Sequence, residues 1–196
     1  MFDLLVATNN DHKLKEMDEM LLPYGIKVHS PKEFNIVDNP IEDGLTFKAN
    51  SLIKANSLAK HTSMPLIADD SGLSVDALNG FPGIYSARFA KECGGNKFAN
   101  LEIIKRLEGK KKDASFFCVI TLMNVEKEPI QFVGECKGRI LETPIGENGF
   151  GYDPIFYSNE AKMGFGNAPD NVKNKYSHRA KAIALLIDYL RTNKLI

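Results

Sequence analysis

The chain has 196 residues, its 25 Lys and Arg are balanced by 25 Asp and Glu, and 43% of its residues are hydrophobic. This composition is typical of a soluble globular protein. The absence of a net charge argues against a protein whose main partner is nucleic acid or an anionic membrane, because either would normally require a basic excess.

Cysteine usage and apolar runs point to an intracellular location. Cys93, Cys118 and Cys136 are odd in number and lack C-x-x-C spacing, so we expect free thiols rather than disulfides or a zinc site. No apolar run is long enough for a membrane span, and the first residues have no basic lead of the kind that signal peptides carry. We therefore expect a cytoplasmic protein that contacts no membrane.

Strand and helix patterns alternate along the first half of the chain. The predicted elements are a strand over 2–7, a helix over 11–22, a strand over 27–30, a helix over 46–61, and strands over 64–68 and 73–78. The helix over 46–61 has an apolar stripe and a second, polar face that carries Asn50, Lys54 and Ser57 at i, i+4 and i+7. Such a face is usually solvated.

The second half predicts a helix over 96–108, with Phe98, Leu101, Ile104 and Leu107 facing inward, and an antiparallel hairpin over 115–125 and 130–136. A short strand at 155–157 and a helix over 177–192 follow. Helices mixed with both βα units and a hairpin indicate an α/β, or mixed α+β, fold with a mixed sheet. No linker separates two independent domains, so we expect one domain over residues 1–196.

Two neighbouring carboxylates follow the predicted strand over 64–68. Asp69 and Asp70 suggest either a solvated turn with Ser71 and Gly72 or a magnesium site, because hard cations take carboxylate oxygens together with substrate phosphates. Successive side chains on a strand point to opposite faces, so only one of the two carboxylates is expected to face a binding site.

A polar loop joins the first strand to the first helix. It consists of Thr8, Asn9, Asn10, Asp11, His12 and Lys13. Free backbone N–H groups at a helix N-terminus attract anions, and Lys13 adds a positive charge, but an ordinary helix N-cap explains the same residues. The chain contains no Walker A sequence.

Six segments stand out by their order and spacing, namely Thr8 to Lys13, Gly44-Leu45-Thr46-Phe47 through Lys54, Ala68 to Leu73, Gly80 to Arg88, Gly149 to Phe156, and Ser177-His178-Arg179. Together they closely resemble the inosine/xanthosine triphosphate pyrophosphatase family, also called Ham1-like. This resemblance covers nearly the whole chain. It implies two lobes around a long, mixed, twisted sheet with the active-site cleft between them, a homodimer, and Mg²⁺-dependent hydrolysis of nucleoside triphosphates to monophosphate and pyrophosphate.

The resemblance also implies roles for individual residues. Asp70 is expected to be the catalytic carboxylate and, with Glu42, a metal ligand. The expected substrate-binding residues are Thr8, Asn9, Asn10, Asp11, His12, Lys13, Lys54, Ser71, Phe150, Gly151, Tyr152, Asp153, Lys173, His178 and Arg179. Asp70 would either deprotonate the attacking water or position a water whose pKa the metal lowers, and the participation of Asp69 is open.

The expected substrates are ITP, dITP and XTP. Lys13, Lys54, Lys173, Arg179 and a divalent ion would offset the roughly four negative charges of a triphosphate. His178 and Arg179 would donate to the 6-oxo group while Phe150 stacks on the base, which leaves donors unpaired against adenine.

Three other functions are compatible with parts of this pattern. A pyrophosphatase of different base selectivity would share the chemistry, and a nucleotide-binding regulatory module without turnover would share the site. RNA binding through the Lys- and Asn-rich stretch 158–175 is disfavoured, because the charge is balanced and the aromatic residues are scattered.

Overall fold

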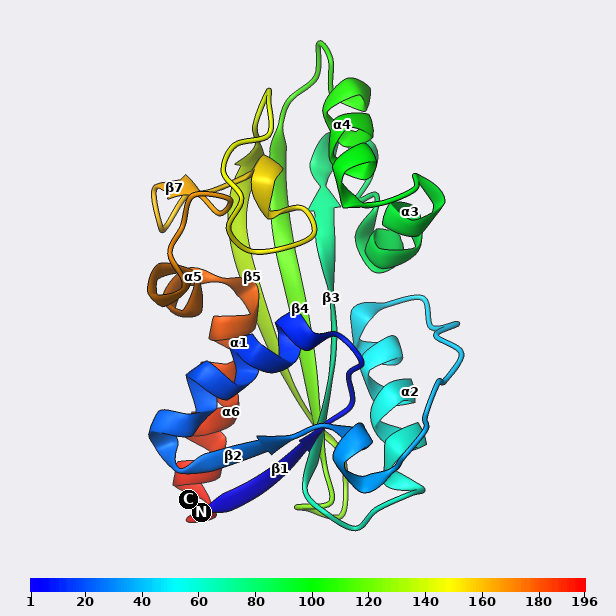
Figure 1. The fold of residues 1–196 in the computed structure, drawn as a ribbon, viewed down its shortest axis with the longest axis vertical. Helices are drawn as coiled ribbons and strands as arrows, with labels where there is room; N and C mark the ends of the chain where they lie inside the picture. Colours follow the sequence, from blue (N-terminus) through cyan, green and yellow to red (C-terminus); the bar gives the residue numbers. More distant parts are fainter. The chain divides into compact units, whose positions relative to one another are not determined.

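The computed structural model describes residues 1–196 and contains one seven-stranded sheet with the order β2-β1-β3-β4-β5-β6-β7 (Figure 1). The strands are β1 (Phe2–Val6), β2 (Ile26–His29), β3 (Leu66–Val75), β4 (Asp113–Met123), β5 (Ile130–Ile140), β6 (Phe156–Ser158) and β7 (Met163–Gly164). β1 pairs in parallel with β2 and β3, whereas β6 is antiparallel to β5 and β7. The sheet is therefore mixed, as the sequence predicts.

Six α-helices accompany the sheet. They are α1 (Asp11–Leu21), α2 (Phe47–Ala59), α3 (Ser86–Glu92), α4 (Asn96–Arg106), α5 (Asp170–Tyr176) and α6 (His178–Thr192). Asn10 and Thr46 cap α1 and α2 through side-chain oxygens that accept from backbone N–H groups of the first turn. No helix combines the length and the apolar character needed to cross a bilayer.

The chain divides into two compact units. Unit 1 comprises residues 1–70, 118–134 and 179–196, and unit 2 comprises residues 71–117 and 135–178. β3, β4 and β5 each contribute residues to both units. The expectation of one domain over residues 1–196 stays a prediction.

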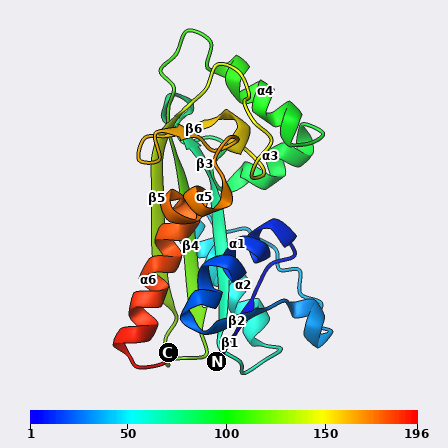
Figure 2. The same cartoon turned by 60° about the vertical axis from the view of Figure 1, so that its left-hand side comes forward.

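In unit 1 the two faces of the sheet pack against different helices (Figures 1 and 2). Leu4 and Ile67 belong to a core cluster with residues of α1 and α6, whereas Leu5, Leu66 and Ala68 belong to a cluster with residues of α2. This division follows from the strand period of two, which sends successive side chains to opposite faces. Odd-numbered β3 residues in unit 1 therefore face α1 and α6, and even-numbered residues face α2.

Unit 2 has a single apolar core. It is formed by Leu73 and Val75 of β3, Phe89 of α3, Ile103 of α4, and aromatic residues that include Phe156 and Phe165. The rings of Phe116, Phe156 and Phe165 lie between 4.6 and 6.3 Å apart, within the range of favourable aromatic pairs.

Two predictions about local structure are wrong, and one helix is missing from the prediction. The strands predicted over 64–68 and 73–78 are one continuous strand, β3, so Asp69 and Asp70 lie within a strand rather than after one. α3 carries no clear period in its seven residues and was not predicted. In α4, Phe98 and Leu101 are 59% and 45% exposed rather than inward.

The inward face of α4 is displaced because it contains a buried polar residue. Ala99, Asn100 and Ile103 are buried, and Asn100 donates from Nδ2 to the carbonyl of Gly151 at 3.1 Å. A pattern that counts only apolar residues misidentifies the buried face of α4, because a hydrogen bond offsets the cost of burying the Asn100 amide. The prediction for α6 is confirmed, since Ala180, Ile183, Ile187 and Leu190 are buried.

A histidine joins the start of the sheet to the segment that follows β2. His29 Nε2 lies 2.8 Å from Asp3 Oδ1, and its Nδ1 lies 2.9 Å from Glu33 Oε2. These hydrogen bonds raise the pKa of His29 above 6.5, with Asp3 the larger cause. The hydrogen bond with His29 lowers the pKa of Asp3, and the backbone N–H of Ser30 is the main cause of the lowered pKa of Glu33.

We predict that His29→Gln lowers the melting temperature more near pH 6 than at pH 9. The imidazolium contributes fully below pH 6.5, and its contribution is lost as the pH rises through its raised pKa. The two carboxylates contribute above their ordinary pKa values and lose their effect in acid. Thermal unfolding at both pH values measures the difference, with exposed His61→Gln as the control. Equal losses at the two pH values would contradict the prediction.

Candidate active site

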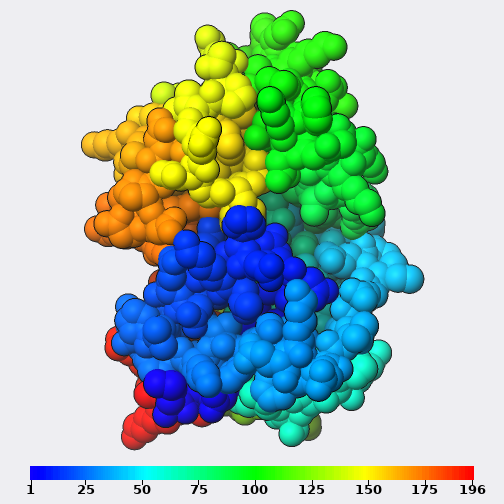
Figure 3. Space-filling view, in the orientation of Figure 1, coloured from blue at the N-terminus to red at the C-terminus, as the bar shows by residue number.

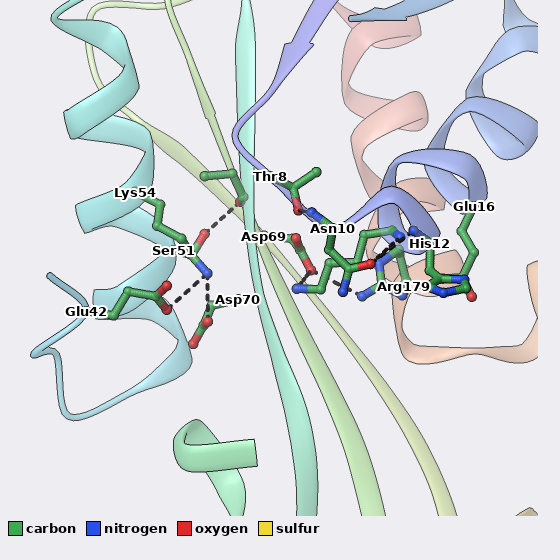
Figure 4. A network of polar contacts seen from close by, with 12 residues as sticks. Thr8, Asn10, His12, Glu16, Glu42, Ser51, Lys54, Asp69, Asp70 and Arg179 are labelled. Carbon is green, nitrogen blue, oxygen red and sulfur yellow. Dashed lines mark hydrogen bonds and ion pairs between the residues drawn. The ribbon is translucent and has the colours of Figure 1, made fainter. Parts of the chain in front are cut away.

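Asp69 joins two cations on the face of β3 that packs against α1 and α6 (Figure 4). Its Oδ2 accepts from Lys13 Nζ at 2.9 Å and from Arg179 Nη2 at 3.2 Å. Arg179 Nη1 also donates to Glu16 Oε2 at 2.5 Å. Asp69 and Arg179 are each 1% exposed. These contacts therefore form an ionic network with a buried centre, which draws on β3, the first two turns of α1 and the first turn of α6.

The network keeps Asp69 ionised in spite of its burial. Burial is the largest single effect and would raise the pKa of Asp69, but the combined charges of Lys13 and Arg179 lower it far below its usual range. For Arg179, burial likewise opposes the charged form, and Asp69 and Glu16 together raise its pKa. Each ion is stable in the interior because its partners are present.

Asp70 faces the opposite side of β3, toward α2. Its Oδ1 accepts from Lys54 Nζ at 2.8 Å, and the same ammonium lies 3.2 Å from Glu42 Oε2. The other carboxylate oxygen of Asp70 is buried and has no hydrogen-bond partner. Lys54 therefore holds two carboxylates together, and one of them keeps an oxygen available for a ligand.

The electrostatics of Asp70 differ from those of Asp69. Burial raises the pKa of Asp70 to about 6, because Lys54 only partly opposes it and Glu42 adds a like charge. Burial would lower the pKa of Lys54, but Asp70, Asp69 and Glu42 together raise it. The ammonium contacts two carboxylates, and Asp69 adds a third negative charge at longer range, so Lys54 does not compensate Asp70 fully.

The polar loop after β1 makes an N-cap at α1. Asn10 Oδ1 accepts from the backbone N–H groups of His12 at 3.0 Å and Lys13 at 3.3 Å, and Thr8 Oγ1 accepts from the backbone N–H of Asn10 at 3.1 Å. Asn9 and Asp11 are exposed. The N-cap interpretation is thus confirmed, and phosphate binding by this loop stays a prediction.

Unit 2 contains a second group of the predicted site residues. Asp153 Oδ2 accepts from the backbone N–H of Phe150 at 2.7 Å and from Lys173 Nζ at 2.6 Å. The Lys173 ammonium lies 4.6 Å from the centre of the Phe150 ring. A Cβ atom on Gly149 would lie 2.1 Å from Asp153 Oδ2, and its φ is +73°, so only glycine fits this turn.

Contacts within unit 2 fix the neighbouring residues. Tyr152 donates from its hydroxyl to the carbonyl of Ser86 at 2.7 Å, and Gly151 is held by Asn100. The imidazole of His178 stacks on Phe116 with ring centres 4.7 Å apart. The base-binding residues expected from sequence thus include a group in unit 2 whose members Tyr152, Asp153, Lys173 and His178 are buried. Arg179 instead contacts carboxylates of unit 1.

Sequence alone missed how the cations are paired. Lys13, Lys54, Arg179 and Lys173 are expected to be available for phosphate, but each one contacts at least one carboxylate. Glu16 was not singled out, although it lies one helical turn after Lys13 and thus on the same face of α1. The polar face of α2 has the spacing of a solvated surface, yet Asn50 is fully buried and the Lys54 side chain is only 13% exposed.

The predicted site residues are distributed over both units. Comparisons with known proteins give matches that cover nearly the whole chain. The model of the Ham1 family matches residues 4–189. A dITP/XTP pyrophosphatase of Vibrio vulnificus is 42% identical, with 100% of both chains covered, and one of Clostridium perfringens is 40% identical over 97% of this chain and 98% of the relative.

Solved structures that resemble this chain include two Ham1 proteins. A HAM1 protein from Coxiella burnetii superposes with a TM-score of 0.85 at 37% identity, covering 98% of this chain and 100% of that one. The Staphylococcus aureus Ham1 protein gives a TM-score of 0.86 at 35% identity, with 97% and 99% of the two chains covered. The match in sequence and in fold extends across both units, and the chain belongs to the Ham1 family.

Proposed function

We propose that this protein hydrolyses non-canonical purine nucleoside triphosphates, namely ITP, dITP and XTP, to the monophosphate and pyrophosphate, and thereby removes them from the nucleotide pool. The names of the relatives support this substrate class. The observation that carries the chemistry is Asp70, whose buried Oδ2 has no partner and which shares the Lys54 ammonium with Glu42. We assign Asp70 as the catalytic carboxylate.

Asp70 and Glu42 would also hold Mg²⁺. The chain gathers no three Asp, Glu, His or Cys side chains as a metal site. Two carboxylates nevertheless suit Mg²⁺, which usually keeps several waters and binds one or two carboxylates together with substrate phosphates. The partnerless oxygen of Asp70 and the acidic side chain of Glu42 fit this donor set. The ion would offset phosphate charge and lower the pKa of a bound water.

The charge balance of unit 1 supports a metal requirement. Three cations, Lys13, Lys54 and Arg179, are gathered with four carboxylates, those of Glu16, Glu42, Asp69 and Asp70. When all are ionised, this group carries a net negative charge and would repel a triphosphate. A divalent cation on Asp70 and Glu42 reverses the sign of the group.

The residues of unit 1 then have separate tasks in the reaction. Lys13 is 18% exposed and contacts Asp69 through a flexible side chain, so its ammonium can also donate to a phosphate oxygen. Asp70 orients the water whose oxygen attacks the α-phosphorus, and pyrophosphate leaves. Lys54 and the loop from Thr8 to Lys13 donate to the phosphate oxygens, which stabilises the charge that develops on the leaving group.

The remaining predicted residues are assigned to the nucleoside. We assign Phe150, Gly151, Tyr152, Asp153, Lys173 and His178 to the base and sugar, with Phe150 stacking on the base and His178 donating to the 6-oxo group. Ser71, which follows Asp70 directly, and Arg179 complete the set of substrate-binding residues. Homodimer formation and a cytoplasmic location, both implied by the sequence, stay predictions.

The product assay tests the proposal most directly. ITP, dITP and XTP should yield pyrophosphate and monophosphate with Mg²⁺ and no product with EDTA, and ATP and GTP should be poor substrates. Orthophosphate as the first product would contradict cleavage between the α and β phosphates. Equal kcat/KM for dITP and dGTP would contradict the base preference alone. Nucleotide binding without turnover would indicate the regulatory alternative.

Asp70→Asn is predicted to lower kcat by about a thousandfold or more while nucleotide binding persists, because the amide neither accepts a proton nor binds a cation as a carboxylate does. Steady-state kinetics and equilibrium titration measure the two effects.

Glu42→Gln and Asp43→Asn form a matched pair for the same assay. Glu42 contacts Lys54, whereas neighbouring Asp43 is exposed, so only Glu42→Gln should raise the Mg²⁺ concentration needed for activity.

For the Asp70→Asn variant, full activity would remove Asp70 from its assigned role.

Lys13→Ala is predicted to raise KM by about 10- to 100-fold, the effect of losing one charge-assisted hydrogen bond to phosphate. Asp69 keeps Arg179 as a partner in this variant, so the protein should still fold. Lys15→Ala, an exposed lysine of the same helix, is the control. An unchanged KM for Lys13→Ala would contradict the assignment of the loop to phosphate.

A further inference from the structure

The polar face of α2 is covered by the segment that precedes the helix. Asn50, Lys54 and Ser57 each contact a different residue of segment 38–44. Asn50 Oδ1 accepts from the backbone N–H of Gly44 at 2.8 Å, Lys54 Nζ lies 3.2 Å from Glu42 Oε2, and Ser57 Oγ donates to Asp38 Oδ1 at 2.6 Å. The contacts run in opposite order along the two partners, so the segment lies antiparallel to α2.

Polar contacts hold residues 38–44, and apolar packing is confined to Ile36, which precedes them and packs against the core cluster beside α2. Residues 36–44 belong to no helix or strand. Val37, Ile41 and Leu45, which could have packed inward, are 83%, 82% and 85% exposed. Figure 3 shows the segment, in light blue, on the surface of unit 1. A surface segment with so little apolar burial depends on its few hydrogen bonds for a defined conformation.

The contact at Gly44 is close. A Cβ atom on Gly44 would lie 2.6 Å from Asn50 Oδ1 and 2.8 Å from the Cβ of Ala49. Asn50 is fully buried, and its Nδ2 has no hydrogen-bond partner. Burying the Asn50 Nδ2 group without a hydrogen-bond partner is unfavourable for folding, so a contribution to stability does not explain why position 50 is asparagine. The hydrogen bond to Gly44, which fixes where the segment joins α2, does account for it.

We propose that Ser57 and Asn50 are positioning residues that fix Glu42 beside Asp70 for the binding of a divalent cation. This inference rests on the proposed role of Glu42 and Asp70 as the metal-binding carboxylates. Ser57 and Asn50 anchor the segment on either side of Glu42, and the side chain of neither residue contacts the side chain of Asp70 or Lys54. They act on the metal site only through the segment.

The physical reason is preorganisation. Asp70 lies on β3, which has a neighbouring strand on each side, whereas Glu42 lies on a segment without regular structure and its side chain is 38% exposed. If the segment moves freely, the binding of a cation must restrict it, and the loss of conformational entropy weakens binding. Anchors at Asp38 and Gly44 restrict the segment before the cation arrives.

The test measures binding of Mn²⁺ alone, by electron paramagnetic resonance of the free ion, to the full chain without nucleotide. Ser57→Ala should weaken Mn²⁺ binding by about tenfold, the equivalent of one lost hydrogen bond of about 1.4 kcal/mol. Ser57→Thr keeps the hydroxyl and should retain the wild-type affinity. Asn56→Ala, at an exposed neighbouring position on α2, is the matched control and should have no effect.

Two further measurements separate positioning from a general loss of structure. Combining Ser57→Ala with Asp38→Asn should weaken Mn²⁺ binding no more than either change alone, because both remove the same contact. In the activity assay, Ser57→Ala should raise the Mg²⁺ concentration for half-maximal rate while kcat at saturating Mg²⁺ stays near the wild-type value. Asn50→Ala should behave in the same way, and thermal unfolding identifies it if it fails to fold.

The outcomes distinguish this inference from the function on which it rests. Wild-type Mn²⁺ affinity in Ser57→Ala, together with weakened binding in Glu42→Gln, would overturn the positioning role and leave the metal site intact. Wild-type affinity in both Glu42→Gln and Asp70→Asn would overturn the metal site and the positioning role together, even if pyrophosphate is produced.

Discussion

The burial of two adjacent carboxylates on β3 constrains the rest of the site. Because successive strand residues face opposite sides of the sheet, Asp69 and Asp70 cannot share a partner on one face. Asp69 is neutralised by Lys13 and Arg179 on one side, and Asp70 contacts Lys54 on the other. An unpaired buried charge would cost several kcal/mol. The positions of α1, α2 and α6 around the sheet of unit 1 are thus tied to the chemistry of two residues.

The same pairing determines what the site can bind. Cations that already contact carboxylates bind an added anion weakly, because phosphate must compete with those carboxylates at short range. The two faces differ in this respect. Asp69 has strong neutralisation and a pKa far below normal, whereas burial and the nearby Glu42 raise the pKa of Asp70. The face toward α2 therefore gains most from an added positive charge, whereas on the face toward α1 the Asp69 carboxylate is already paired with two cations.

Sequence patterns predict most of the fold but little of this charge pairing. The helical period identifies α1, α2 and α6, and the change of period after α4 identifies the hairpin of β4 and β5. Asp69 and Asp70 were predicted to follow a strand because charged residues rarely continue a buried one. The partners that allow them to do so are 56 and 110 positions away from Asp69 in the chain. No local window contains that information, and the family resemblance supplies roles for residues without supplying their contacts.

The polar face of α2 shows why an aligned set of polar residues is ambiguous. On the helix alone, Asn50, Lys54 and Ser57 have the spacing of a solvated surface, and the spacing would be the same if a chain segment covered them. The difference lies in segment 38–44, which has few buried apolar residues and presents Asp38, Glu42 and a backbone N–H at matching intervals. Polar residues on a helix therefore need to be read together with the polar residues of any unstructured neighbour. In this chain, the contacts of α2 connect Glu42, on a segment without regular structure, to Asp70 on an inner strand of the sheet.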